Sequence, residues 1–413
     1  MGVASHNLAR LVRICFLTHY YPPEVGAPQA RISGLARALS ERGAAVTVHT
    51  GFPHYPDGVV RAGYSNRAYL VESDGPVRVV RTAVYPAANR GFGRRLANHA
   101  SLSMSALAGA RLSGPADVVV CESPPLFLAG AAVPFARLKR APLMLNVADR
   151  WPASAVELGA LSDRRAIAAA EWLEREVYER SRAISVPTEG LHRDLEAVPA
   201  ARGKVILLGP SVETDRFDPS PAPAAERLGV LYAGTVGMAQ GLDTLVEAAL
   251  VAGPEVVEVT IAGDGADAPA LRERLARKRI GNVRMVGSVA HERVPELYAA
   301  SDAAVVLLRD RPIFEGALPT KMLEAMAAGR AILLSARGEA ARLVERCGAG
   351  LVTEPEDAAA LAQTFAELGS DRDRLAALGR EGRRCAVEQF DRARVADRWW
   401  EVLRSLVSGS RPR

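Results

Sequence analysis

Short apolar runs rich in β-branched residues alternate with segments of helical spacing over almost the whole sequence, and the alternation occurs twice. This pattern is typical of parallel sheets whose two faces are covered by helices. In the first half it predicts strands at 12–18, 45–50, 77–82, 117–121, 143–147, 183–186 and 205–208. In the second half it predicts strands at 229–233, 256–262, 283–286, 303–308, 331–334 and 350–352. We therefore expect an α/β protein with two doubly wound parallel sheets, each in its own Rossmann-like domain.

A proline-rich segment separates the two alternating patterns. Three prolines in five residues, at 219, 221 and 223, cannot continue a helix or a central strand. We expect an N-terminal domain at 1–215, a linker at 216–226, a C-terminal domain at 227–390 and a final helix at 391–413. Trp399 and Trp400 in this final helix are large apolar groups that need a partner surface. The helix is therefore expected to pack back on the first domain.

The cysteines and the apolar runs argue against a secreted or membrane-spanning protein. Four cysteines lie far apart, without the C-x-x-C or His-rich spacing of a zinc site and without the density of a disulfide framework: Cys15, Cys121, Cys347 and Cys385. No run approaches the roughly 18 apolar residues of a membrane span. The first 13 residues lack the apolar core of a signal peptide. We expect a cytoplasmic protein in a reducing compartment.

Positive charge is concentrated near the N-terminus. Residues 1–150 contain 17 Lys and Arg against 8 Asp and Glu, and the segment 93–112 mixes basic with apolar residues. Such a surface can rest peripherally on anionic lipid headgroups, at about 1 kcal/mol per cation near the membrane. An ordinary solvated surface explains the charge equally well. Nucleic acid is not an expected partner, because no aromatic side chains interleave the basic residues.

Residues that directly follow strands are the first candidates for ligand binding, because doubly wound sheets bind ligands at the carboxyl ends of their strands. Gly26 precedes the helix predicted from Pro28 and would let backbone amides approach a phosphate or a sugar hydroxyl. In the second half, two glycine-rich turns follow adjacent predicted strands and contain Gly234, Thr235, Gly237, Gly263, Asp264 and Gly265. These turns can bring N–H groups onto a diphosphate. The dinucleotide fingerprint G-x-G-x-x-G is absent from the first turn, which argues against an NAD enzyme.

The segment 307–329 contains the most informative pattern. Pro319 suits the first turn of a helix and leaves the amides of Thr320 and Lys321 free for an anion. Glu324 follows one helical turn later, where its carboxylate can accept hydrogen bonds from the two hydroxyls of a ribose. A carboxylate of this kind beside a phosphate-binding helix start predicts nucleotide recognition.

Two loops of the first half also follow predicted strands. Asp149, Arg150 and Trp151 come directly after the strand at 143–147. Asp149 can bind an acceptor hydroxyl, and Trp151 can form an apolar wall for a sugar or a lipid. His54 follows the strand at 45–50, where a lone loop histidine is more often a surface residue than a catalyst.

Taken in order, these motifs resemble the retaining GT-B glycosyltransferases, a large family that includes sucrose synthase-like and bacterial polysaccharide enzymes. The similarity is strongest to the branch that makes capsule, O-antigen or colanic-acid-type polymers. The matching segments are YPPE at 21–24, GFPHYP at 51–56, DRWP at 149–152, AQGL at 239–242 and PTKMLE at 319–324. The resemblance implies a GT-B fold in which the two domains face a central cleft.

The resemblance also implies roles for individual residues. Glu324 would hold the donor ribose, and Thr320 and Lys321 would meet the diphosphate. Gly263 to Gly265 and Val289 would line the nucleotide pocket, while Gly26 would approach donor or acceptor.

Two family positions differ in this sequence. The first carboxylate of the usual Glu-x7-Glu pair corresponds to Gly316, with Glu315 one residue away. The basic residues that neutralise the diphosphate in many relatives correspond to Thr235 and Gln240. We expect Lys321, Arg309 and the helix-start amides to replace them.

The mechanism implied by the resemblance is front-face attack with retention of configuration, in which the leaving diphosphate helps to deprotonate the acceptor hydroxyl. The catalytic candidates are then Asp149, Glu315 and Lys321. The candidates for binding the acceptor are His54, Arg150 and Trp151. No Asp-x-Asp triplet is present, so we expect neither a metal nor another cofactor. The donor would be a UDP- or GDP-sugar, and the acceptor would be a saccharide or a polyprenyl-linked saccharide. The alternatives are a GT-B nucleotide-sugar epimerase or phosphorylase, and a non-catalytic nucleotide-sugar-binding partner subunit.

Overall fold

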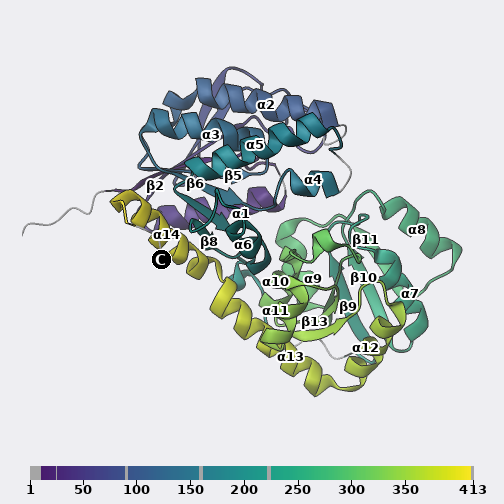
Figure 1. Cartoon of the computed structure of the whole chain (residues 1–413). Helices are drawn as coiled ribbons and strands as arrows, with labels where there is room; N and C mark the ends of the chain where they lie inside the picture. The colour runs from purple at the N-terminus through teal and green to yellow at the C-terminus, as the bar shows by residue number, and fades with distance from the viewer. Residues whose placement is uncertain (1–10, 25, 89–91, 158–160, 221–224, 411–413) are drawn as a thin grey trace, which may run out of the picture. The chain divides into compact units, whose positions relative to one another are not determined.

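The computed structural model describes residues 11–410 apart from 25, 89–91, 158–160 and 221–224. The chain divides into two compact units (Figure 1). One combines the chain up to Gly209 with the segment from Ala396, and the other is Pro210–Val395. Outside the described part lie residues 221–224 of the predicted linker. The same holds for the first ten residues, for which we expected no signal peptide.

The first unit contains an eight-stranded sheet of order β3-β4-β2-β1-β5-β6-β7-β8. Its strands are β1 (Arg13–Leu17), β2 (Ala45–Gly51), β3 (Tyr69–Asp74), β4 (Val77–Thr82), β5 (Val118–Ser123), β6 (Leu143–Val147), β7 (Ala183–Val186) and β8 (Val205–Leu207). All neighbours are parallel except the edge pair β3 and β4. The sequence prediction missed β3, because this edge strand alternates exposed with half-buried residues and has no apolar run.

Helices cover both faces of this sheet. They are α1 (Ala27–Glu41), α2 (Phe92–Ala108), α3 (Leu126–Lys139), α4 (Ala153–Glu157), α5 (Arg164–Arg180) and α6 (Glu189–Glu196). The helices α2, α3 and α5 lie together on one face, and α1 lies on the other (Figure 1). Two helix starts have side-chain caps, since Asp163 accepts from the Ala166 amide and Thr188 from the Leu191 amide.

The final helix α14 (Arg392–Ser408) belongs to the first unit from Ala396 onward. Its apolar stripe is buried, including Trp399 at 4% exposure and Leu403 at 0%. Asp397 accepts a 2.7 Å hydrogen bond from Arg42 Nε at the end of α1. From Ala396 onward the helix therefore packs as part of the first unit.

The second unit contains a fully parallel six-stranded sheet of order β11-β10-β9-β12-β13-β14. Its strands are β9 (Leu228–Ala233), β10 (Val257–Ala262), β11 (Val283–Gly287), β12 (Ala303–Leu307), β13 (Ala331–Ser335) and β14 (Gly350–Thr353). Its helices are α7 (Leu242–Ala252), α8 (Ala268–Arg277), α9 (Val294–Ala299), α10 (Thr320–Ala327), α11 (Glu339–Cys347), α12 (Ala358–Ser370) and α13 (Arg372–Cys385).

Alternate residues of the central strands supply two separate cores. Val305 and Leu333 pack with α7 and α12 on one face. Val306 and Leu334 pack with α10 and α11 on the other. Burial on both faces explains why these strands appear in the sequence as continuous apolar runs. The predicted fold class, two doubly wound α/β domains, is confirmed.

The cysteine spacing predicted no disulfide framework, but the described residues contain one disulfide. Cys347 at the end of α11 and Cys385 at the end of α13 are bonded, with a Cα–Cα distance of 5.9 Å. The two positions are 38 residues apart in sequence, and only the packing of the two helices brings them together. Cys15 and Cys121 are buried free thiols.

Among the residues that the structure describes, no helix combines the length and the apolar character needed to cross a membrane. The same residues contain no group of three or more His, Cys, Asp or Glu side chains suited to a metal ion.

Candidate functional site

Two glycine turns stack on each other at the carboxyl ends of β9 and β10. The Val236 amide donates to Asp264 O at 3.0 Å. A Cβ on Gly263 would lie 1.8 Å from Gly234 O, and one on Gly265 would lie 2.3 Å from Val236 O. Both glycines have positive φ, at 144° and 159°. Only glycine permits this close approach of two backbones, so Gly263 and Gly265 let the two turns pack into one surface, here called the glycine floor.

The ammonium of Lys321, in the first turn of α10, lies over this floor. A Cβ on Gly234 would be 2.8 Å from Lys321 Nζ. Nζ donates to Tyr232 Oη at 2.7 Å and lies 4.1 Å from the centre of the Tyr232 ring. The Tyr232 hydroxyl donates in turn to Thr235 O at 2.5 Å. Tyr232 thus fixes the position of the ammonium, which keeps further N–H donors for an anion.

Burial makes Lys321 easier to deprotonate than an ordinary lysine. Removal from water lowers its pKa to about 8, and the charge of Glu324 opposes this shift. At neutral pH the ammonium is therefore still charged, in a poorly solvated place where its attraction for an anion is strong.

Glu324 projects from the same helix one turn further on. Burial raises its pKa to about 7, against the opposing charges of Arg216 and Lys321. Its neighbours Met322, Leu323 and Ala325 are fully buried. Throughout the described structure, no hydrogen bond engages the Glu324 carboxylate. Two acceptor oxygens next to a cation are thus available for vicinal hydroxyls.

Arg309 lies near the glycine turn, but protein groups already engage its guanidinium. Nε donates to Met238 O at 2.7 Å, and Nη1 donates to Glu356 Oε1 at 2.6 Å. The Arg309 amide also donates to Ala239 O at 3.0 Å. These contacts favour a role in holding the turn, which leaves Lys321 as the better placed cation for a diphosphate.

The remaining predicted donor residues differ in their exposure. Thr320 and Thr235 are exposed, whereas Gly237 and Val289 are half-buried. Asp264 accepts from the Gly265 amide at 2.9 Å and pairs with Arg272 at 3.6 Å.

Glu315 does not join Lys321 and Glu324 through any contact in the described residues. Its side chain is exposed, while its carbonyl oxygen accepts from the Glu339 amide at 2.6 Å.

In the first unit, His54 is not the surface residue that a lone loop histidine suggests. It is 3% exposed, its Nδ1 donates to Phe52 O at 2.8 Å, and its Nε2 accepts from Asn98 Nδ2 at 2.7 Å. The backbone amides of His54 and Tyr55 both donate to Glu24 at 2.8 Å. Burial raises the pKa of Glu24. The loop after β2 is thus tied to the loop after β1 and to α2.

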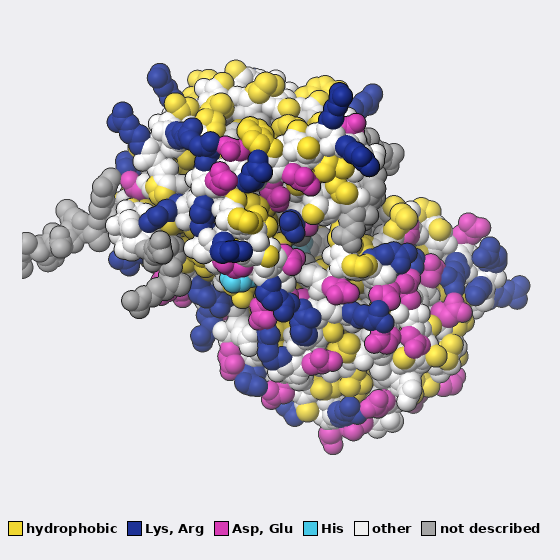
Figure 2. Space-filling model, in the orientation of Figure 1, with side chains coloured by type: hydrophobic (Ala, Val, Ile, Leu, Met, Phe, Trp, Pro, Cys, Tyr) yellow, Lys and Arg dark blue, Asp and Glu magenta, His cyan; other side chains and the backbone are white. Residues whose placement is uncertain are grey.

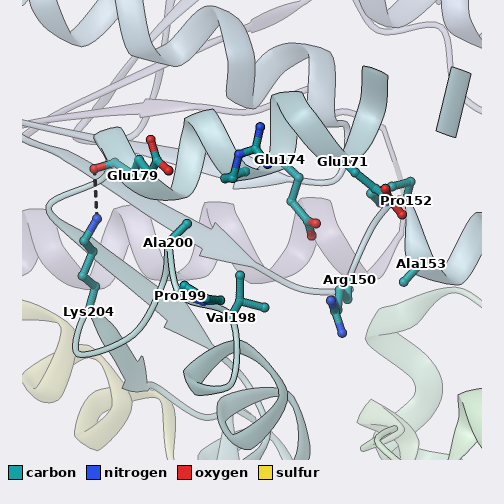
Figure 3. Close-up of a pocket in the computed structure, with 11 residues that line it drawn as sticks. Arg150, Pro152, Ala153, Glu171, Glu174, Glu179, Val198, Pro199, Ala200 and Lys204 are labelled. Carbon is teal, nitrogen blue, oxygen red and sulfur yellow. Dashed lines mark hydrogen bonds between the residues drawn. The ribbon is translucent and has the colours of Figure 1, made fainter. Parts of the chain in front are cut away.

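The segment after β6 borders a pocket of about 630 Å³ (Figure 3). Arg150 lines it, together with Pro152, Ala153, Glu171, Glu174, Arg175, Glu179, Val198, Pro199, Ala200 and Lys204. Arg150 Nε is buried without a hydrogen-bond partner among the described residues. This volume suits a small organic ligand or a saccharide unit. Asp149 is exposed beside it, and Trp151 packs half-buried against the core.

Gly26 is the N-cap residue of α1, whose first turn contains Pro28. Its φ of 165° is extended, so the backbone itself does not require glycine. A Cβ there would lie 2.5 Å from Gln29 Oε1, the end of a flexible side chain.

The sequence reasoning missed several residues of these sites. Tyr232 is a hydroxyl-bearing residue in an apolar strand, two positions before Gly234, and this placement was its only signal. His19 directly follows the predicted strand at 12–18, and this position was its only signal. Arg216 and Asn98 carried no local signal, because their partners are remote in sequence.

Two family models match most of the chain between them. Residues 26–211 match the Glycosyl transferase 4-like domain, and residues 227–371 match Glycosyl transferases group 1. The chain therefore belongs to the GT-B glycosyltransferases.

Individual relatives agree with this assignment. A GDP-mannose-dependent α-(1-6)-phosphatidylinositol monomannoside mannosyltransferase of Mycobacterium tuberculosis is 32% identical over 48% of this chain, and the match spans only 55% of that enzyme. The putative colanic acid biosynthesis glycosyl transferase WcaI of Escherichia coli is 24% identical, over 83% of this chain and 88% of WcaI.

A solved structure shares the fold. Anabaena HepE in complex with UDP and glucose aligns with a TM-score of 0.71 at 17% identity, over 95% of this chain and all of HepE.

Proposed function

We propose that this protein is a retaining glycosyltransferase that moves a sugar from a UDP- or GDP-sugar to a hydroxyl of a saccharide acceptor without a metal ion. The observation that carries the proposal is the placement of Lys321 Nζ over the Gly234 turn, one helical turn from the unoccupied Glu324 carboxylate. A cation with nearby amides suits a diphosphate, and the carboxylate suits a ribose. The GDP-mannose of one relative and the UDP and glucose of HepE support these two donor classes.

The chemistry follows from where charge develops. The bond between the anomeric carbon and the diphosphate oxygen breaks while the acceptor oxygen bonds to the same face of the sugar. The acceptor proton passes to the departing diphosphate. Lys321 and the first amides of α10 stabilise the negative charge that grows on the leaving group. No protein nucleophile is required.

The acceptor would bind in the first unit. Asp149 is exposed after β6 and can accept a hydrogen bond from the attacking hydroxyl. Arg150, Trp151 and the adjacent pocket provide polar and apolar contacts for the rest of the saccharide, and His54 contributes through the loop that it orders.

The first unit also has a surface suited to a lipid-linked acceptor at an anionic membrane. Met104 of α2 and Leu138 of α3 are 68% and 66% exposed, and Arg94 and Arg95 are exposed on α2. In Figure 2, dark-blue Lys and Arg side chains surround hydrophobic patches in the region of these helices. We infer a cytoplasmic protein that contacts the membrane peripherally and acts in cell-surface polysaccharide synthesis. Co-sedimentation with phosphatidylglycerol vesicles but not phosphatidylcholine vesicles is expected.

The test is nucleotide release from UDP- and GDP-sugars with and without a lipid-linked saccharide acceptor. Release should depend on the acceptor, the product should keep the anomeric configuration of the donor by NMR, and excess EDTA should leave the rate unchanged. Lys321→Ala should lower kcat by about 10²-fold or more, in the range of a lost transition-state charge partner. Lys278→Ala, an exposed lysine beyond α8, is the matched control.

Other outcomes separate the alternatives. Conversion of the donor sugar without an acceptor would indicate an epimerase. Nucleotide binding without turnover would indicate a non-catalytic partner subunit. Unchanged turnover and donor affinity in Lys321→Ala would refute the assigned site.

A further inference from the structure

A buried hydrogen-bond acceptor without a donor lies just beyond the carboxyl end of β1. His19 is 2% exposed, and its Nε2 lies 2.7 Å from Asn98 Oδ1. Its other ring nitrogen, Nδ1, is buried and has no hydrogen-bond partner in the described part of the chain. Leaving a buried polar atom unpaired costs about 1–3 kcal/mol, so such an atom calls for an explanation.

The surrounding hydrogen bonds define which nitrogen of His19 carries the proton. Asn98 Nδ2 lies 2.6 Å from Tyr85 O, a carbonyl that can only accept, so the amide nitrogen must face it. The same Nδ2 lies 2.7 Å from His54 Nε2, which therefore accepts. Asn98 Oδ1 then faces His19 and accepts from Nε2–H. A neutral imidazole has a single N–H, so His19 Nδ1 carries a lone pair.

The ring of His19 stays neutral in this environment. Burial lowers its pKa well below the ordinary value, and the neighbouring His99 and His54 act in the same direction. The lone pair at Nδ1 is therefore an acceptor that Asn98 holds in one orientation.

Aromatic rings surround this acceptor. The rings of Tyr20 and His99 lie 4.5 Å and 4.8 Å from the His19 ring, centre to centre, and Tyr55 lies 5.0 Å from Tyr20. Tyr20 and His99 are both half-buried, and a ligand that reached Nδ1 would have to displace one of these two side chains. Ring faces with one directed polar atom, at the carboxyl end of a parallel sheet, are the usual makeup of a small polar ligand site.

We propose that His19 Nδ1 accepts a hydrogen bond from a hydroxyl of a bound saccharide, with Tyr20 and His99 as the wall of the site. His19 is a binding residue in this scheme, and Asn98 is a positioning residue that selects the tautomer. The inference rests on the proposed glycosyltransferase function. The hydroxyl can belong to the acceptor saccharide or to the donor sugar, and the experiments distinguish the two.

The direct test observes the nitrogen itself in the full-length protein. Long-range ¹H–¹⁵N spectra of histidine-labelled protein, assigned with His19→Gln, should show Nδ1 unprotonated in the free state. Addition of methyl α-D-mannoside, methyl α-D-glucoside, UDP-glucose or GDP-mannose should move that resonance upfield for the saccharide that binds. A resonance unmoved by all four probes would overturn the proposal and leave an ordered water as the partner. Asn98→Leu should add a population with the proton on Nδ1.

Enzyme kinetics provide a second test. His19→Phe keeps a ring but has no lone pair and should raise the KM of the bound saccharide about tenfold, whereas His19→Gln, which offers a carbonyl oxygen, should recover part of the loss. His192→Gln on α6 is the control. If the hydroxyl belongs to the acceptor, His19→Phe should raise the KM of the acceptor and not that of the donor sugar, and if it belongs to the donor, the KM of the donor sugar should rise instead.

These outcomes keep the two proposals separate. Wild-type kinetics in His19→Phe would refute the role of His19 while leaving the transferase intact. A wild-type protein without transfer activity would refute the proposed function, and the NMR shift would still report whether His19 binds a saccharide.

Discussion

The proposed ribose-binding role of Glu324 places nucleotide binding and stability in opposition. Burial raises its pKa from 4.5 to about 7, so the folded protein disfavours the ionised carboxylate that a ribose requires. Because the pKa of Glu324 is higher in the folded than in the unfolded chain, its protonated carboxyl contributes to the free energy of unfolding. This contribution is fully present below pH 4.5 and is lost as the pH rises through about 7. Replacing Glu324 by Gln removes this ionisation and should stabilise the nucleotide-free protein at alkaline pH.

The size of the effect follows from the shift. A displacement of roughly 2.5 pKa units at 1.36 kcal/mol per unit corresponds to about 3 kcal/mol at pH 8. At pH 5 the gain should fall to about 1 kcal/mol, because most of the carboxyl is then protonated in the folded state. For a unit of this size, about 3 kcal/mol raises Tm by several degrees.

The assay is thermal unfolding of wild type and Glu324→Gln at pH 8 and pH 5, with and without UDP or GDP. The variant should melt several degrees higher at pH 8 without nucleotide, and the nucleotide should no longer raise its Tm. Glu273→Gln, at an exposed position on α8, should change neither quantity. Equal or lower stability of Glu324→Gln at pH 8 would refute the burial argument, and continued stabilisation by nucleotide would refute the ribose role.

Two further predictions concern the glycine floor and the cation of the proposed donor site. Tyr232→Phe removes the hydroxyl that supports the Lys321 ammonium, so the pKa of Lys321 should fall further below about 8 and the alkaline limit of nucleotide affinity should move down by about one pH unit. Calorimetric titrations with UDP and GDP across pH measure this limit. Tyr298→Phe is the control, because Tyr298 Oη donates to the carbonyl oxygen of Lys321, at 3.0 Å, and not to its ammonium. An unchanged alkaline limit of nucleotide affinity in Tyr232→Phe would contradict the assigned contact. Gly263→Ala should destabilise the second unit by about 2 kcal/mol or more and abolish nucleotide binding, because the new Cβ would lie 1.8 Å from Gly234 O. Chemical denaturation measures the loss, and Gly281→Ala, with open space around its Cβ, should be nearly neutral.

Much of the fold was predictable because its signals are local. Residues such as Val305 and Leu333 belong to strands buried on both faces, which appear as short apolar runs in any alternating α/β sequence. The edge strand β3 escaped prediction because half of its side chains face solvent and its sequence carries no apolar run. The Cys347–Cys385 bond was missed because it depends on the packing of two helices whose ends are distant in sequence.

The candidate site was predictable only in part, for the same reason. The Gly234 and Gly263 turns and the Thr320 to Glu324 helix start were found from residue types and spacing alone. The assignment of Arg309 to the diphosphate is less supported, because Met238 and Glu356 engage its side chain from other segments. His54 was assigned as an acceptor residue, but its partner Asn98 is 44 positions away.

The sequence by itself determined the two sheets, the glycine turns and the carboxylate one turn after a helix start, since each depends on residues that are neighbours along the chain. Only the tertiary structure decided the chemistry of those residues. It set Lys321 on Tyr232, 89 positions earlier, and it removed much of the water from around Glu324. Burial and charge are properties of a three-dimensional neighbourhood, so the shifted pKa values of Lys321 and Glu324 and the single tautomer of His19 exist only in the folded chain.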